Sequence, residues 1–462
     1  MRRISSPLRP MAMAATLLAL AGCATLSDDG GRGQVGQMVE ERGGPGLAKG
    51  PVQQQLDALL AAPVTVDSAV RIAMLGNRSL QAAYAELGIA EADLVQAGRI
   101  ANPVFSFGRL KGHHGVEIER QLMLPVIGLL TMPLARRLEQ RRYELAQMRT
   151  AGDVLRVADE TRRAWYSAVA AQQTAEYMDQ VKTAAEASAE LARRMAVAGN
   201  WSKLQHAREQ AFYADAVAQL ARARHARTAE REKLARLMGV ANTFTLPERL
   251  PELPASARAA ADAETQAMAN RLDILMAQKE LAGLAASLGL TRTTRFVNLL
   301  DISYLRNRDE EGERTSGYEI ELQIPLFDWG GARVAKAEAM YMQAVHRAAG
   351  AALDARSQVR ESYSAYRTAY DLARHYRDEV VPLKKRISDE QLLRYNGMLI
   401  SVFELLADAR EQVTAVNASI EAQRDYWIAD AALQAAMTGS GAGAAGPSRP
   451  ATPAAASGAA QH

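Results

Sequence analysis

The chain is poor in aromatic residues and cysteine, and beyond its N-terminus it has no long apolar run. Aromatic residues make up only 5% of the chain, although apolar residues reach 48%, mostly as Ala, Leu and Val. This balance favours long helices packed through small side chains over the core of a globular enzyme. The single cysteine, Cys23, excludes a disulfide within the chain. Without a run of about twenty apolar residues, no membrane-spanning helix is expected after the N-terminus.

No pattern in the sequence indicates catalysis or nucleic-acid binding. The net charge of +3 is spread along the chain without a dense basic face, so no nucleic-acid partner is expected. The G-x-S-x-G, P-loop and H-E-x-x-H motifs are missing. The adjacent His113 and His114 invite a metal interpretation, but no third ligand lies nearby, and a polar hairpin loop is the simpler interpretation. We therefore expect neither an enzyme nor a bound cofactor or metal.

The N-terminus has the features of a secretory signal. Arg2 and Arg3 precede the short apolar run Met11–Ala21 and then Gly22-Cys23. The segment Leu20–Cys23 closely resembles the bacterial lipobox, which implies removal of residues 1–22 and lipidation of Cys23. The alternative is an ordinary signal with an incidental cysteine. Ala24, where a sorting aspartate is absent, implies the outer membrane as the destination.

Two short stretches look like copies of one strand-to-helix unit. Residues 317–331 read GYEIELQIPLFDWGG, and residues 115–128 read GVEIERQLMLPVIG. Both alternate apolar and polar residues as a strand does, and both then reach a proline and a long helical segment. The first copy lacks the Asp-Trp-Gly ending of the second, which leaves the end of its strand pair uncertain.

The first repeat is expected at 65–240, after a flexible lipidated tether at 23–64. Its predicted parts are a helix from Thr65 to about Asn102, a hairpin at 103–125 and a long helical hairpin at 133–240. Alanines at heptad spacing line the first long helix, and Gly199-Asn200 reverses the chain. A proline-rich connector follows at 241–256.

The second repeat is expected at 257–437. It has the same order: a helix around 257–290, a hairpin at 296–326 and a helical hairpin at 332–437. Pro382 predicts a local disturbance in the first of these helices, and Asn396-Gly397 reverses the chain. The low-complexity tail, residues 438–462, is expected to be disordered. The fold class is thus mainly α with a small β part.

Four strands cannot close into a barrel, and open sheet edges inside lipid leave backbone groups unsatisfied. Three chains with four strands each would supply twelve, which is enough for a closed barrel with a polar lumen. Acidic side chains are costly against lipid, so we expect them to line this lumen: Glu117, Glu119, Glu319 and Glu321. The alternative makes them surface charges of a soluble hairpin.

From Thr65 to Met437 the chain resembles the TolC-type outer-membrane factors. The most specific parts are Ile324–Gly330, Ala198–Ser202 and Tyr395-Asn396-Gly397 followed by Phe403–Leu406. The resemblance implies a homotrimer with a twelve-stranded barrel and a helical tunnel that extends into the periplasm. It places Gly199, Asn200, Asn396 and Gly397 at the tunnel tip, where an adaptor protein binds. It also makes Glu404 and Asp408 candidates for a charged constriction, although acids on such helices are more often solvated or paired.

The expected function is a passive outer-membrane duct of a tripartite efflux pump, working with a periplasmic adaptor and an inner-membrane transporter, for which the RND type is expected. A duct of a type I protein secretion system would have the same fold. Two other classes are a periplasmic adaptor, which needs one helical hairpin flanked by small β-domains, and a soluble coiled-coil scaffold, which needs neither lipobox nor strands. The 17 methionines form no dense cluster, so the sequence does not indicate whether drugs, metal ions or proteins are carried.

Overall fold

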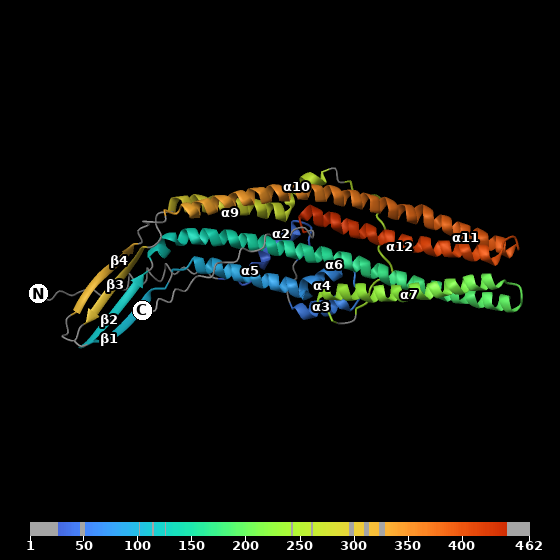
Figure 1. Cartoon of the computed structure of the whole chain (residues 1–462), viewed down its shortest axis with the longest axis horizontal. Coiled ribbons are helices and arrows are strands. Elements are labelled where there is room, and N and C mark those ends of the chain that lie inside the picture. The colour runs from blue at the N-terminus through green and yellow to red at the C-terminus, as the bar shows by residue number, and fades with distance from the viewer. Residues whose placement is uncertain are drawn as a thin grey trace. The chain divides into compact units, whose positions relative to one another are not determined.

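The computed structural model describes residues 26–46, 51–100, 102–112, 115–124, 126–241, 244–259, 262–294, 300–308, 314–322 and 329–440. These residues form a mainly helical protein with one four-stranded antiparallel sheet, which confirms the predicted class (Figure 1). Several predicted features lie outside the described residues: the signal at 1–22, Cys23, His113-His114 and the tail beyond Ser440.

The chain divides into two compact units, and each takes segments from both predicted repeats. Unit 1 holds the sheet and consists of the N-terminal residues up to Val35 with 83–148 and 277–348. Unit 2 consists of 36–82, 149–276 and the residues from 349 on. Five of the described helices have residues in both units: α2 (Arg32–Glu40), α5 (Arg78–Ala97), α6 (Val126–Val197), α9 (Leu272–Thr294) and α10 (Gly331–His375).

The sheet of unit 1 has the strand order β1-β2-β3-β4, and all neighbouring strands are antiparallel. The two predicted hairpins correspond to its outer pairs: β1 (Val104–Gly112) with β2 (Gly115–Leu124), and β3 (Leu300–Arg308) with β4 (Arg314–Leu322). Pairing of β2 with β3 joins the hairpins. Both hairpin turns lie at the same end of the sheet, and the helices connect at the other end.

Helix α6 begins at Val126, seven residues before the predicted start at 133. The prediction placed the start at Pro133 because no strong helix breaker follows until about Gly199. The helix instead contains Pro133 in its interior, where the missing N–H removes one hydrogen bond. The other 71 residues of this 72-residue helix include no second proline, so the helix continues through this point.

The predicted single helix from Thr65 to Asn102 is two helices, α4 (Val66–Gly76) and α5. Asn77 separates them and connects both to α7 (Lys203–Met238): its side-chain amide donates to the Leu237 carbonyl at 2.8 Å. The Asn77 side-chain oxygen accepts from the Leu80 amide at 3.0 Å and so caps α5. A tertiary contact therefore stabilises a break that helical periodicity does not reveal.

The second repeat has a break at the corresponding place, between α8 (Ala263–Asn270) and α9. Here the residue between the helices is Arg271, which is 3% exposed. Its guanidinium donates to Asp273 at 2.6 Å, to the Ala436 carbonyl at 2.7 Å and to Gln358 at 2.9 Å. The buried charge is thus satisfied by a carboxylate and two neutral oxygens.

The segment predicted as a flexible tether contains two short helices, α2 (Arg32–Glu40) and α3 (Val52–Leu60). Val35 and Val39 of α2 are fully buried. Leu56, Leu59 and Leu60 of α3 pack against a large apolar cluster of unit 2. The prediction is wrong for these helices because it weighed Gly and polar content and not the helical spacing of the few apolar residues.

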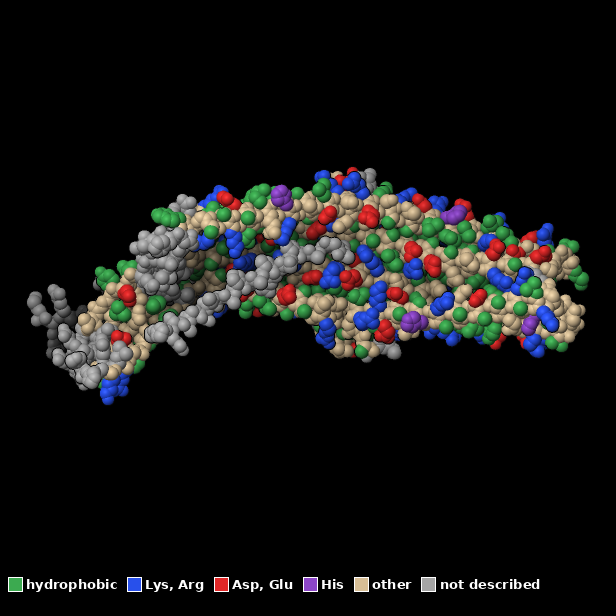
Figure 2. All heavy atoms as spheres, viewed as in Figure 1, with side chains coloured by type: hydrophobic (Ala, Val, Ile, Leu, Met, Phe, Trp, Pro, Cys, Tyr) green, Lys and Arg blue, Asp and Glu red, His purple; other side chains and the backbone are tan. Residues whose placement is uncertain are grey.

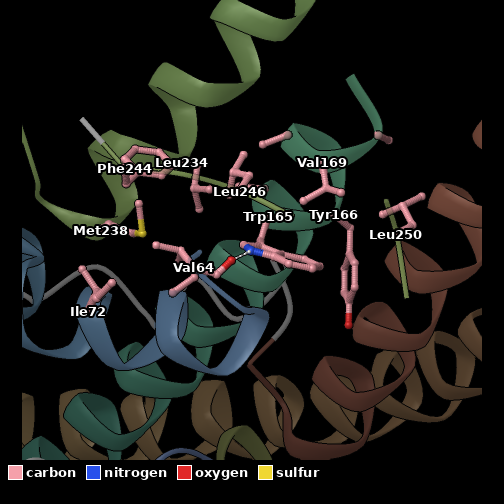
Figure 3. Close-up of a cluster of buried hydrophobic side chains, with 14 of the residues drawn as sticks. Val64, Ile72, Trp165, Tyr166, Val169, Leu234, Met238, Phe244, Leu246 and Leu250 are labelled. Atoms are coloured by element: carbon pink, nitrogen blue, oxygen red, sulfur yellow. Dashed lines mark hydrogen bonds between the residues drawn. The ribbon is translucent and has the colours of Figure 1, made fainter. Parts of the chain in front are cut away.

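This apolar cluster joins α4, α6 and α7 with the segment 244–250 (Figure 3). At its centre Trp165 is 2% exposed, and its ring N–H donates to the Val64 carbonyl at 2.8 Å. Tyr166 contacts the edge of Trp165 and stacks on Trp427 of α12 (Val402–Thr438), with ring centroids 5.2 and 5.3 Å apart. The cluster therefore also holds the last helix of the second repeat. Burying each large side chain contributes about 1.5–3 kcal/mol.

The second helical hairpin of unit 2 consists of the end of α10, a π-helical turn at Tyr376–Val380, α11 (Val381–Asn396) and α12. The π turn ends two residues before Pro382, where the sequence predicted a disturbance. Pro382 cannot donate to the carbonyl four residues earlier, and one wider turn accommodates this loss.

The predicted tail boundary at residue 438 is too early. Gly439 closes α12 with φ +78°, and Ser440 is buried. The Ser440 hydroxyl donates to Asp159 of α6 at 2.5 Å. Burial raises the pKa of Asp159, although the Ser440 hydroxyl and Arg162 both act to lower it. The first residues after α12 are therefore part of the packed core.

Candidate functional site: the sheet faces and the helix reversals

Strand pairing places all four predicted lumen acids on one face of the sheet. Glu119 lies opposite Gly108 and Asn307, and Glu319 lies opposite Ser303. Because side chains alternate between faces along a strand, the odd-numbered positions of β2, β3 and β4 share this face. We call it the acidic face, and its acids are Glu117, Glu119, Asp301, Glu319 and Glu321.

The acids with described side chains are reached by solvent to different degrees. Glu119 is half-buried, and a Cβ on the facing Gly108 would come within 3.1 Å of its carboxylate. Glycine at 108 therefore leaves room for the Glu119 side chain. Glu319 is exposed. For Glu117 and Glu321 the structure describes the strand positions alone.

The opposite face, which we call the apolar face, carries a row of exposed large side chains across all four strands. The row is Phe105, Leu122, Tyr304 and Tyr318, whose exposed fractions are 64%, 41%, 51% and 79%. Ile320, one row further toward the helices, is also exposed. A contiguous apolar surface of this kind indicates contact with lipid or with another protein surface.

Among the described residues, each of the two edge strands pairs on one side only. β1 has only β2 as a neighbour, and β4 has only β3. Exposed edges present unpaired N–H and C=O groups that pair readily with another chain. The sheet is therefore suited to continue into the sheets of further copies.

The first helix reversal follows the prediction in detail. Gly199 has φ +75°, and the amides of Gly199 and Asn200 donate to the carbonyls of Ala196 and Met195 at 3.1 and 2.9 Å. This pair of bonds is a Schellman motif, in which a left-handed glycine ends the helix. Ser202 then begins α7 with a capping box to Gln205.

The second reversal has the same motif but a different left-handed residue. Gly397 has φ −80°, and Met398 adopts φ +60°, the one positive φ at a non-glycine position in the described chain. The amides of Met398 and Leu399 donate to Tyr395 and Arg394 at 2.9 Å each. The left-handed residue of the reversal therefore lies one position after the predicted pair Asn396-Gly397. The glycine preference drew attention to Gly397, although α11 runs to Asn396 and needs its left-handed residue later.

Both reversals carry exposed apolar side chains. Val197 and Leu204 flank the first, and Met398 and Leu399 form the second, with Met398 93% exposed. These four side chains are largely uncovered by the described residues of the chain. They are typical of a surface that another protein covers.

The predicted constriction acid Glu404 has a local structural role. Its carboxylate accepts from the Ser401 amide at 3.1 Å, and the Ser401 hydroxyl accepts from the Glu404 amide at 3.4 Å. This capping box begins α12 and matches that of α7. Asp408 differs, because one of its carboxylate oxygens is buried without a hydrogen-bond partner among the described residues.

An acid that sequence analysis did not single out links the two helical hairpins. Glu209 of α7 is 1% exposed and accepts from the Ser188 hydroxyl of α6 at 2.7 Å. It also pairs with Arg410 of α12 at 2.6 Å, and that guanidinium lies 4.3 Å above the Phe212 ring. The available signal was heptad spacing, since Glu209 precedes the buried Ala216 by seven residues.

Two general features of the described residues bear on function. None of their helices is long and apolar enough to cross a bilayer. In the same residues, no three His, Cys, Asp or Glu side chains gather where a metal ion could bind.

Comparisons with known proteins agree with this architecture. Residues 264–439, less than half of the chain, match the family model described as outer membrane efflux protein. No curated protein matches the chain in sequence.

Solved structures with the same fold are outer-membrane channels or proteins. A CusC structure, from work on transmembrane channel formation, has TM-score 0.67 and 13% identity and covers 81% of this chain and 92% of its own. The outer membrane protein VceC of Vibrio cholerae has TM-score 0.63 and 17% identity over 80% of this chain and 95% of its own. The open MtrE outer membrane channel of Neisseria gonorrhoeae has TM-score 0.65 and 17% identity over 80% and 88%. Residues 264–439 thus match the outer membrane efflux protein family, and the chain as a whole has the fold of these outer-membrane channels.

Proposed function

We propose that three copies of this chain form the outer-membrane duct of a tripartite efflux system, a passive conduit that exports drugs or metal ions. The observation that carries this proposal is the sheet: one face is apolar and exposed, the other holds every strand acid, and both edges are open. Three copies of the four-stranded sheet would supply twelve strands, and closure would satisfy every edge.

In the proposed barrel the apolar face contacts lipid and the acidic face lines the lumen. An acid near the middle of a bilayer is costly, whereas a water-filled lumen solvates it. Phe105, Tyr304 and Tyr318 would then lie against acyl chains. Glu117, Glu119, Glu319 and Glu321 would give the lumen a negative potential.

The helix reversals would meet a periplasmic adaptor protein, and an inner-membrane transporter, with the RND type expected, would supply the energy. The exposed apolar residues at Gly199-Asn200 and at Asn396–Leu399 support this assignment. Of the two constriction candidates, Asp408 is favoured, because capping already occupies Glu404.

Cys23 would anchor each copy in the inner leaflet through acyl chains. Each buried methylene contributes about 0.8 kcal/mol to such binding. We expect metabolic labelling with radioactive palmitate to mark the wild-type chain and not Cys23→Ala. Labelling retained in the variant would contradict this anchor.

A type I secretion duct remains the alternative within the same fold. The adaptor class is not favoured, because the chain has two helical hairpins and one sheet in place of one hairpin flanked by small β-domains.

The direct test is extraction of the full-length chain. We expect it in the outer-membrane fraction, soluble only with detergent, with a light-scattering mass of three copies. Deleting its gene should raise the sensitivity of the cell to the exported compounds, and restoring it should reverse this. A chain recovered without detergent as a monomer would rule out the duct.

A further inference from the structure

The strand residues separate their charges completely between the two faces of the sheet. All strand acids lie on the acidic face, and all strand bases lie on the apolar face. The bases also gather at one end of their face, toward the hairpin turns: Arg109, Lys111, Arg120, Arg306, Arg308 and Arg314. We call these positions the basic band.

The basic band begins one row beyond the aromatic row. Phe105 lies opposite Leu122, and two residues further along β1, Phe107 lies opposite Arg120, which in turn pairs with Arg306. A step of two residues along a strand is about 7 Å. Along the strands, the side chains of the apolar face thus change from aromatic to basic from one row to the next. This change occurs in both hairpins.

Several side chains of the band are free to reach a partner. Arg109, Lys111, Arg120 and Arg306 are exposed, and basic side chains stand at the hairpin end of the sheet in Figure 2. Within the described chain none of the three arginines forms an ion pair with an acid. Each acid of the described strands lies on the opposite face, so within these strands no acid stands beside the basic band.

The chemistry selects the occupant of such a band. Arginine is costly near the middle of a bilayer, and this cost falls steeply toward the interface. A guanidinium also binds phosphate through two parallel hydrogen bonds that the opposite charges strengthen. A neutral headgroup lacks this charge. A continuous lipid-facing surface that is apolar and then basic fits a lipid with acyl chains below and phosphate groups above.

We propose that the basic band binds the phosphate groups of anionic lipids in the leaflet that the hairpin ends reach. This inference rests on the proposed membrane duct, since it assigns the apolar face to lipid. The band would fix the height of the barrel in the membrane and collect a shell of phosphorylated lipid around it.

The test compares lipid binding by two triple variants of the full-length chain in detergent. One is Arg109→Gln/Arg120→Gln/Arg306→Gln. The control, Arg222→Gln/Arg227→Gln/Arg347→Gln, removes three exposed arginines from the helices. The probe is fluorescent lipid A with two phosphates, and the comparison lipid is its dephosphorylated form.

We expect the sheet variant to bind diphosphorylated lipid A at least about tenfold more weakly than the wild type, and the control variant to match the wild type. Lysine at the same three sheet positions should restore most of the affinity. The dephosphorylated lipid should bind weakly to every variant.

Equal affinity of the sheet variant and the control would overturn the proposal. Inorganic phosphate that binds the band as tightly as the lipid would assign it to a free anion and would also overturn it. Membrane fractionation and trimer mass are measured on each protein first. A wild-type chain that is no membrane trimer contradicts the duct itself, whereas a trimeric variant with unchanged lipid affinity contradicts only the basic band. If the triple variant does not fold, the three single variants and the lysine variant carry the comparison.

Discussion

The two helix reversals place different residue types at the left-handed position that ends the helix. Each long helix needs a left-handed residue to end in a Schellman motif, and Gly199 provides it in the first hairpin at φ +75°. In the second hairpin Met398 takes this conformation, while the neighbouring Gly397 has an ordinary negative φ. A side chain in the left-handed region costs about 1–2 kcal/mol, so the second reversal holds strain that the first does not.

Alanine substitutions should distinguish the two glycines. We expect Gly199→Ala to lower the free energy of unfolding by about 1 kcal/mol, because alanine resists positive φ while no neighbouring atom lies within 4 Å of the new Cβ. Gly397→Ala should be neutral or slightly stabilising, since its φ suits alanine and its Cβ would meet atoms at 3.6 Å or more. Denaturant unfolding followed by circular dichroism measures both.

Met398→Gly is the converse change at the same reversal. We expect it to stabilise the chain by about 1 kcal/mol through relief of the left-handed strain. Loss of stability in this variant would show that the exposed methionine makes contacts that outweigh the strain. The adaptor surface proposed for this reversal suggests that such contacts form in the assembled system and not in the isolated chain.

At the scale of elements, the chain is organised by two helical hairpins that a buried charge connects. Residues 207–210 and 409–412 occupy matching places in the two repeats, and both read AREQ. Glu209 of the first segment pairs with Arg410 of the second. The repeat counterpart of Glu209 is Glu411, which pairs with Lys384 at the surface of the second hairpin. The same sequence motif thus supplies one link between the hairpins and one within a hairpin.

The two pairs should differ in energy. Arg410→Met leaves the Glu209 carboxylate buried with only the Ser188 hydroxyl. We expect a loss of about 2 kcal/mol, below the roughly 3–5 kcal/mol typical of broken buried pairs, because Arg410 is one-third exposed. Combining it with Glu209→Gln should cost less than the sum of the single changes. The matched double-mutant cycle at Lys384 and Glu411 should give a coupling free energy of at most about 0.5 kcal/mol. Equal coupling free energies in the two cycles would contradict the predicted difference between the buried pair and the surface pair.

The elements were predictable where periodicity is local, and not where a distant contact decides. Alternation along Gly317–Leu322 and its twin gave the strands, their shared face and the separation of Glu119 and Glu319 from the apolar side chains. The break at Asn77 depends on the Leu237 carbonyl, which lies 160 residues away along the chain, and no local pattern contains that information. The pairing of Glu209 with Arg410 is hidden for the same reason.

At the scale of the whole molecule, the open edges of the described sheet are the feature that supports the proposed assembly. β1 and β4 are the edges, both are nine residues long, and neither contains a proline that would discourage pairing. Edge strands of this length are a hazard in an isolated soluble protein. They are instead expected where identical copies close a barrel, each β4 pairing with the β1 of the next copy.

Engineered cysteines can test this closure, because Cys23 is the only native cysteine. Ser106 of β1 and three positions of β4, Thr315, Gly317 and Glu319, share the acidic face. We expect Ser106→Cys combined with a cysteine at one of these β4 positions to give disulfide-linked dimers and trimers under mild oxidation, because a closed ring brings one such pair within reach. The register of β4 against β1 of the next copy decides which of the three positions forms the disulfide.

The control combines Ser106→Cys with Ser303→Cys, because β3 is an inner strand that no other copy can reach. It should remain uncrosslinked, as should each single variant. A ladder that continues beyond three copies would indicate an open sheet, since only a ring that closes leaves no free edge for a further chain. If none of the three β4 positions crosslinks with Ser106→Cys, the edges of neighbouring copies do not meet. That result would contradict the barrel and the assignment of the acidic face to a lumen.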